Sequence, residues 1–268
     1  MITSSQNPKI QAVRALLGRN RERRDSGLFV IEGVRLAEEA LASGWQVQQA
    51  CYCENLNERG MQIIGHLAEI GVIAQPVTSA IMRSLTDTET SQGILLILSM
   101  RSIILPQFLD FVIIADAIRD PGNLGTLLRS AWAASAQAVI LTHNSTDAFA
   151  PKVLRAGMGA HFHLPILALD WPSIFTLLKN RPYPLEIFVA ESSGGASLWE
   201  TDLRKPCALV IGNETEGPSP EAFGLADAHL HIPMPGNSES LNAAAAAAIL
   251  LFEVVRQRRS SFQDPHSR

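Results

Sequence analysis

Three short segments of this 268-residue chain concentrate polar side chains that could do chemistry. They hold three amides, three hydroxyls, carboxylates and a guanidinium, groups that orient a substrate by hydrogen bonds and balance its charge. The segments are Asp120-Pro-Gly-Asn-Leu-Gly-Thr-Leu-Leu-Arg129, Gly212-Asn-Glu-Thr-Glu-Gly217 and Ser240-Leu-Asn242.

The first segment carries the signals of a turn that opens a helix. Asp120-Pro-Gly122 is turn chemistry, and Asn123 is predicted to cap the helix that follows. A helix amino terminus offers N–H groups to an anion, and Arg129 can reach back along the helix. A capped helix with a surface arginine is the alternative. Gly122 and Gly125 do not form a dinucleotide-binding fingerprint.

The second segment places Glu214 and Glu216 between Gly212 and Gly217, directly after an apolar run. An acidic pair could ligate a metal, but no histidine or third carboxylate stands nearby in the sequence. The glycines fit equally well a backbone that approaches a flat ligand closely.

The third segment precedes six consecutive alanines, 243–248. Ser240 is a suitable helix cap and would place Asn242 in the first turn. Alanines let a helix approach another helix closely. The apolar continuation 249–252 argues against a solvent-exposed alanine helix, and Trp132 and Phe252 are expected to be core residues.

Short apolar strands alternate with helices in two series, so the polar segments would lie in loops at strand ends. The break at 99–108, with Pro106, predicts a linker and hence domains at 1–100 and 101–268. The second series predicts an α/β fold with a mainly parallel sheet covered on both faces, with ligands bound at the carboxyl ends of its strands. The first series predicts strands at 28–31, 47–52, 72–77 and 93–98 and helices at 33–43 and 61–70. The second predicts strands at 111–115, 138–141, 185–190, 208–211 and 230–232 and helices at 123–134, 150–156, 171–179 and 241–258.

Composition describes a globular protein with 47% apolar residues and a net charge of −4. Three cysteines form no disulfide framework or zinc site, and the amino terminus has no signal-peptide pattern, so a cytoplasmic location is expected. The charge is uneven: residues 1–25 carry six basic and two acidic side chains, a net +4. This is either a solvated helix face or an arm that contacts phosphates through Arg21, Arg23 and Arg24.

Together the three segments resemble the SpoU (TrmH-type) branch of the SPOUT family of RNA 2′-O-ribose methyltransferases. Weaker agreement comes from 85–94 and 155–160, and residues 1–35 look like the family's amino-terminal L30e-like substrate-binding domain. The resemblance implies a small L30e-like α/β domain followed by an α/β-knot methyltransferase domain with a deep trefoil knot. It also implies a homodimer that forms through the carboxyl-terminal domain and its alanine-rich helix.

The resemblance further implies that S-adenosyl-L-methionine is the cofactor and that no metal is required. By motif position, the cofactor would contact Gly212, Ile232 and Leu241. The equivalents of Asn123, Arg129, Glu214, Ser240 and Asn242 would form the catalytic constellation. A guanidinium keeps its proton above about pH 12, so Arg129 is expected to grip a phosphate and stabilise the developing alkoxide rather than act as a base.

The expected substrate is ribosomal RNA, because the chain carries an amino-terminal domain that the shorter tRNA enzymes of the family lack. Alternatives are a tRNA 2′-O-methyltransferase, a non-catalytic L30e-type RNA-binding protein and a nucleotide-dependent oxidoreductase. A substitution at Asn123, Arg129 or Asn242 would favour the non-catalytic RNA-binding protein, but all three residues are present.

Overall fold

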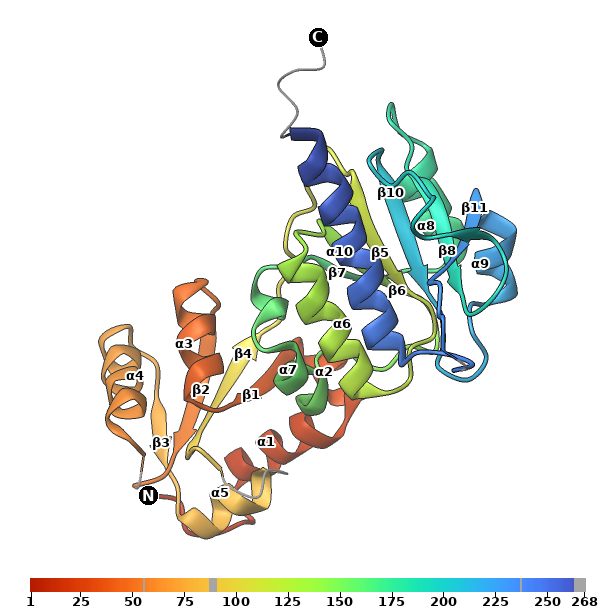
Figure 1. Cartoon of the computed structure of the whole chain (residues 1–268). Coiled ribbons are helices and arrows are strands. Elements are labelled where there is room, and N and C mark those ends of the chain that lie inside the picture. Colours follow the sequence, from red (N-terminus) through yellow and green to blue (C-terminus); the bar gives the residue numbers. More distant parts are fainter. Residues whose placement is uncertain (55, 87–90, 237, 263–268) are drawn as a thin grey trace. The chain divides into compact units, whose positions relative to one another are not determined.

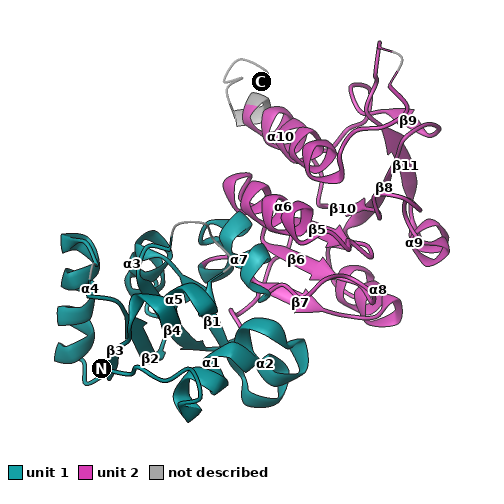
Figure 2. Ribbon diagram, turned by 90° about the horizontal axis from the view of Figure 1, so that it is seen from below, with its two compact units in different colours: residues 1–101, 149–162 teal, residues 102–148, 163–268 magenta. Residues whose placement is uncertain are grey.

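The computed structural model describes residues 1–54, 56–86, 91–236 and 238–262. Residues 87–90 of the segment 85–94, and Asn237 before the third polar segment, lie outside this description. The chain forms two compact units (Figure 2): residues 1–101 with 149–162, and residues 102–148 with 163–268.

The first unit contains a four-stranded mixed sheet in the order β1-β4-β2-β3. Strand β4 is antiparallel to both β1 and β2, whereas β2 and β3 are parallel. The strands are β1 (Leu28–Glu32), β2 (Val47–Tyr52), β3 (Ala74–Pro76) and β4 (Ile94–Ser99). The described residues up to 101 also form the helices α1 (Pro8–Gly18), α2 (Asn20–Ser26), α3 (Val34–Ala42), α4 (Glu58–Glu69) and α5 (Ser79–Leu85).

The core of this unit follows the alternation of side chains along its strands. Val30, Leu95 and Ile97 pack on one side with buried residues of α1 and α5. Phe29 points the other way, and its ring centroid lies 5.6 Å from that of Trp45 in an edge-to-face contact.

Residues 149–162 join the first unit through the same aromatic cluster, although the sequence boundary places them in the second domain. The ring of Phe149 lies 4.8 Å from that of Phe29, and Trp45 Nε1 donates to the carbonyl of Phe162 at 3.3 Å. Buried aromatic contacts of this kind hold α7 (Pro151–Gly157) and the 3₁₀ turn η1 (Ala160–Phe162) against the unit.

The basic amino-terminal segment forms α1 and α2 and is not an extended arm. Arg23 is 4% exposed, and its Nη1 donates to the carbonyls of Leu16 at 2.5 Å and Leu17 at 3.3 Å. The guanidinium thereby satisfies carbonyls at the end of α1 and ties the two helices together. Arg23 is therefore a structural residue in this fold, whereas Arg21 and Arg24 are exposed.

The second unit contains a seven-stranded sheet in the order β7-β6-β5-β10-β8-β11-β9, with parallel pairing throughout. Strand β10 comes late in the chain but lies between β5 and β8 near the middle of the sheet (Figure 1). The strands are β5 (Phe111–Ala115), β6 (Ala138–Leu141), β7 (Ile166–Ala168), β8 (Glu186–Glu191), β9 (Ala196–Ser197), β10 (Cys207–Ile211) and β11 (Ala228–His231).

Helices cover both faces of this sheet, as the apolar strands predict. Val112, Ile114 and Val210 pack on one face with residues of α8 (Trp171–Lys179) and α9 (Pro220–Leu225). On the opposite face α6 (Pro121–Ala133) packs against α10 (Ala243–Phe262), as Figure 2 shows. The predicted α/β class with a mainly parallel sheet is confirmed.

Two expectations about the core are wrong. Trp132 on α6 is 38% exposed, and Phe252 on α10 is 50% exposed. Trp132 is covered in part by the ring of His163, which stacks on it at 4.5 Å. The periodicity of an amphipathic helix marks its apolar residues but does not say which of them stay exposed in the folded unit. Among the described residues no helix is both long and apolar enough to span a membrane.

Candidate active site

The loops that follow β8, β10 and β11 enclose a cleft of about 500 Å³ in the second unit. This places a ligand-sized opening at the carboxyl ends of parallel strands, where open α/β sheets bind their ligands. Gly212, Ile232 and Leu241, the predicted cofactor contacts, all line the cleft.

A second opening adjoins the first, because both are lined by Asn213, Glu214, Ser240 and Leu241. This rim also contains Asn123 and Asn242, so four of the five predicted catalytic residues meet there.

Side-chain hydrogen bonds connect three of these residues across the three loops. Asn242 Nδ2 donates to Asn123 Oδ1 at 2.9 Å, and Asn123 Nδ2 donates to Glu214 Oε1 at 2.8 Å. Each bond fixes the orientation of the two side chains that it joins, and Asn123 keeps one amide N–H and one oxygen lone pair for a further partner. We call these three residues the amide–carboxylate chain.

Helix caps hold the two amides in place, and both caps differ from the sequence prediction. Asp120, not Asn123, caps α6, since its Oδ1 accepts from the Asn123 backbone N–H at 2.8 Å. Asn242, not Ser240, caps α10, with Oδ1 accepting from the N–H groups of Ala244 and Ala245 at 3.0 and 3.2 Å. In each case the helix is capped by the side chain that lies nearest to the free N–H groups of its first turn.

The loop after β10 is tightly folded around Gly212. A Cβ at this position would lie 2.2 Å from the backbone nitrogen of Pro218 and 2.4 Å from the carbonyl carbon of Gly217. Asn213 and Gly217 bond to each other through both backbone groups at 3.0 Å, and Gly217 has φ of 72°. Only glycine fits at 212, because backbone atoms cannot move aside as a flexible side chain can.

Two buried polar residues anchor this loop to the sheet. Asn213 Oδ1 accepts from the N–H groups of Thr215 and Glu216, and its Nδ2 donates to the carbonyl of Ala117 at 2.8 Å. Asp116, 2% exposed, accepts from Thr142 Oγ1 at 2.8 Å and from the Ser219 N–H at 2.6 Å. The loop after β10 is therefore fastened to the end of β5.

Carboxylates are frequent around the cleft, where Glu191 and Glu239 line it together with Glu214 and Glu216. Their negative charge suits a ligand that carries positive charge. Sequence reasoning missed Glu191 and Asn213. Both lie at or just after the end of an apolar strand, so the strand-end rule could have found them.

Arg129 is the one predicted catalytic residue that lines neither opening. It is exposed on α6, six residues after Asn123, which corresponds to roughly 9 Å along the axis and about 120° around it. The structure thus brings Asn123, Glu214, Ser240 and Asn242 together and leaves Arg129 on another side of the helix.

Neither metal nor thiol chemistry has a group of residues to support it in the described part of the chain. No cluster of three or more His, Cys, Asp or Glu side chains able to hold a metal occurs there. Burial raises the pKa of Cys207 and of Cys51 to about 11, so both thiols stay protonated at neutral pH and are poor nucleophiles.

Comparisons with known proteins match this arrangement. A family model described as the SpoU rRNA Methylase family covers residues 110–252, and one described as the MRM3-like substrate binding domain covers residues 7–96. The chain therefore belongs to the SpoU rRNA methylase family.

Two relatives are named as methyltransferases of ribosomal RNA. The chain is 34% identical to 23S rRNA (guanosine(2553)-2′-O)-methyltransferase RlmP of Bacillus subtilis, over 94% of this chain and 98% of the relative. It is 32% identical to rRNA methyltransferase 3, mitochondrial, of Mus musculus, over 96% of this chain and 74% of the relative. The crystal structure of the SpoU methyltransferase AviRb from Streptomyces viridochromogenes, in complex with the cofactor AdoMet, superposes with a TM-score of 0.87. It shares 29% identity, over 95% of this chain and 99% of that one.

Substitution of Gly212 by alanine should loosen the loop after β10, because the added Cβ meets backbone atoms on two sides. We expect hydrogen exchange at the amides of 213–217 to accelerate at least tenfold in Gly212→Ala. Gly224→Ala is the matched control, since a Cβ there meets nothing within 4 Å. Equal protection in the two variants would contradict the close packing described.

Proposed function

We propose that this protein transfers a methyl group from S-adenosyl-L-methionine to a ribose 2′-hydroxyl of RNA, with ribosomal RNA as the substrate. The observation that carries the proposal is the amide–carboxylate chain at the rim of the cleft lined by Gly212, Ile232 and Leu241. The names of the relatives support ribosomal RNA, and the AdoMet complex of AviRb supports the cofactor.

The cleft fits this cofactor on its own chemistry. Gly212 lines the cleft without a side chain of its own, and four carboxylates lie around the opening. When bound, S-adenosyl-L-methionine supplies a methyl group on a cationic sulfonium. Glu191, Glu214, Glu216 and Glu239 would balance positive charge, while Ile232 and Leu241 would cover apolar surface.

The chain's residues then position the ribose. Asn123, Ser240 and Asn242 would hold the sugar by hydrogen bonds, with Glu214 fixing the orientation of Asn123. Negative charge builds on the 2′-oxygen as its proton leaves, and a guanidinium that keeps its own proton can stabilise this charge. We assign that role to Arg129, together with a grip on the neighbouring phosphate. Arg129 lines neither opening, so the role requires its long side chain to reach back along α6 toward Asn123 when RNA is bound. Holding the 2′-hydroxyl in line with the methyl group would provide much of the rate acceleration.

The domain assignment also belongs to the proposal: residues 1–100 as an L30e-like substrate-binding domain and 101–268 as the methyltransferase domain. The extents of the two family models support it. The trefoil knot is supported by the TM-score of 0.87 with the SpoU methyltransferase AviRb, which indicates a shared fold. A cytoplasmic location is supported by three buried, free cysteines.

Mapping 2′-O-methyl groups by mass spectrometry, in rRNA and tRNA from cells with and without the protein, tests the function. One methylated rRNA site should disappear in cells without the protein and return when the wild-type gene is restored.

Arg129→Lys keeps the positive charge but loses the planar fork of the guanidinium, so we expect kcat to fall about 100-fold with unchanged cofactor affinity. Arg204→Lys, an exposed arginine paired with Asp202, is the control.

Loss of the methyl group from tRNA alone would replace the substrate by tRNA. No change in either RNA would favour the non-catalytic RNA-binding protein, and wild-type activity in Arg129→Lys would remove Arg129 from the mechanism.

We further propose that Arg21 and Arg24 on α2 contact RNA phosphates. Arg21 is 88% exposed at its side chain and bonded only to the exposed Asp25 among described residues, at 3.2 Å. The double variant Arg21→Gln/Arg24→Gln should weaken RNA binding and lower the slope of log K against log salt by about 1 to 2, with cofactor affinity unchanged. Arg23→Gln should instead lower the melting temperature, because it removes buried hydrogen bonds. An unchanged salt slope in the double variant would exclude this surface.

A homodimer through α6 and α10 completes the proposal. Ile249 and Phe252 on α10 are 36% and 50% exposed, and the small residues of α10 permit close helix packing. We expect the wild type to have the mass of a dimer in light scattering and Phe252→Glu to shift toward monomer. Phe175→Glu, which alters an exposed phenylalanine on α8, should leave the mass unchanged. A monomeric wild type would contradict the interface.

A further inference from the structure

The first unit contains a cavity of about 210 Å³ to which no role has yet been given. Four elements build it: α1, β1, α5 and α7. Its volume lies below the range of about 300–1,000 Å³ for drug-sized ligands, which leaves room for one small planar group. The lining residues are Arg14, Leu17, Gly18, Val30, Glu32, Ser84, Leu85, Pro151, Leu154 and Arg155.

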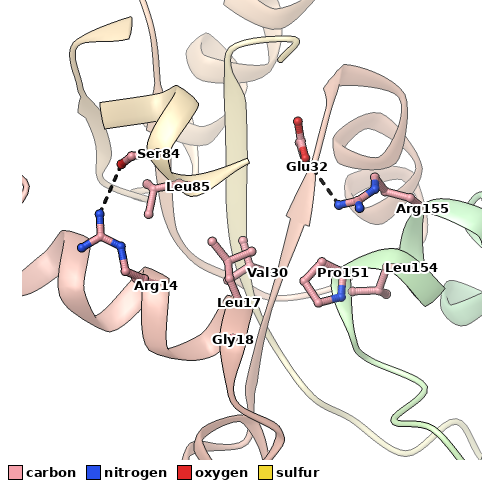
Figure 3. A pocket seen from close by; sticks show the side chains of 10 residues that line it. All are labelled: Arg14, Leu17, Gly18, Val30, Glu32, Ser84, Leu85, Pro151, Leu154 and Arg155. Atoms are coloured by element: carbon pink, nitrogen blue, oxygen red, sulfur yellow. Dashed lines mark hydrogen bonds and ion pairs between the residues drawn. The ribbon is translucent and has the colours of Figure 1, made fainter. Parts of the chain in front are cut away.

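The walls combine apolar surface with charge. Figure 3 shows the guanidinium groups of Arg14 and Arg155 on opposite sides of a set of apolar side chains that includes Val30 and Leu154. An apolar pocket with charged groups at its edges suits a ligand with a flat body and an anionic substituent.

Neighbouring side chains hold both guanidinium groups in place. Arg14 Nη2 donates to Ser84 Oγ at 3.2 Å, and Arg155 Nη1 lies 3.7 Å from Glu32 Oε2. A guanidinium carries five N–H donors in a planar fork, so these contacts leave donors that can bind a phosphate. Its flat face can also stack on a base.

Glu32 adds an acceptor to the same cavity. Its side chain is only 10% exposed, so the carboxylate is largely shielded from solvent. Carboxylates accept hydrogen bonds from the N–H groups on the edges of nucleobases. The cavity thus offers an apolar slot for a ring, an acceptor for its edge and cations for its phosphate.

We propose that this cavity binds one unpaired nucleotide of the RNA substrate, its base in the apolar slot and its phosphate on Arg14. Proteins read RNA sequence mainly at single-stranded positions, where a base can leave the stack. We assign this nucleotide to a contact of its own, separate from the ribose held by the amide–carboxylate chain. The inference rests on the proposed function in taking RNA as the substrate.

Binding can be tested directly on the full-length protein by methyl NMR. Leu17, Val30, Leu85 and Leu154 provide methyl groups around the cavity. Titration with the four nucleoside 5′-monophosphates should shift these resonances in a saturable way, whereas inorganic phosphate should not. Ser84 is exposed and lines the cavity, so the indole ring of Ser84→Trp should block the cavity entrance. Nucleotides should then no longer shift the methyl resonances. No shift at millimolar nucleotide, or the same shifts with inorganic phosphate, would overturn the proposal.

The consequence for the RNA reaction is a change in KM and not in kcat. We expect Ser84→Trp and Arg14→Gln each to raise the KM for rRNA about tenfold, because each variant loses the contact with one nucleotide. The kcat at saturating RNA should stay within about twofold of the wild-type value. Arg35→Gln is the control, an exposed arginine on α3 of the same unit that does not line the cavity. Melting curves verify that each variant is folded.

The outcomes separate this inference from the proposed function. If wild type methylates rRNA and both cavity variants keep the wild-type KM, the cavity inference fails and the function stands. If wild type methylates no RNA but binds nucleotides in the cavity, the function fails and the nucleotide site stands.

Discussion

The bond between the side chains of Asn123 and Asn242 joins residues 119 positions apart, and the geometry of the site depends on it. Each amide also belongs to the first turn or the cap of a helix, α6 or α10. Helix packing therefore sets where the two amides meet, and the bond between them fixes the orientation of both. Glu214 extends the same link to the loop after β10. Side-chain hydrogen bonds thereby connect three loops that are far apart in the sequence.

Much of this could be predicted because the relevant signals are local. Apolar runs identified β5, β6 and α8 with the bounds that the structure has, and the polar segments at strand ends identified where the cleft lies. The caps were predicted less well, since several residues before α6 and α10 can accept a hydrogen bond. Asp120 and Asn242 take the role through geometry that sequence spacing does not reveal.

Other features could not be predicted because they depend on contacts between distant segments. The packing of Phe149 and Phe162 with Phe29 and Trp45 brings 149–162 into the first unit, and no local pattern marks that choice. Likewise, Arg23 looks like its neighbours Arg21 and Arg24 in sequence. Its burial follows from the short connection between α1 and α2, which leaves carbonyls of Leu16 and Leu17 within its reach. Net charge alone cannot separate a structural arginine from a binding one.

The position of β10 between β5 and β8 has a consequence for how the chain matures during synthesis. At about 5–20 residues per second, a ribosome needs roughly 5–20 s to proceed from the end of β5 to the end of β10. During this time the edge of β5 has no β10 beside it, and the edge of β8 is open for the last 20 residues, about 1–4 s, so the backbone groups of both strands are exposed to wrong partners. Early collapse of those two edges onto each other would close the place that β10 must enter. The second unit is therefore expected to fold correctly only if β5 and β8 stay apart until β10, a fully buried strand, has been made.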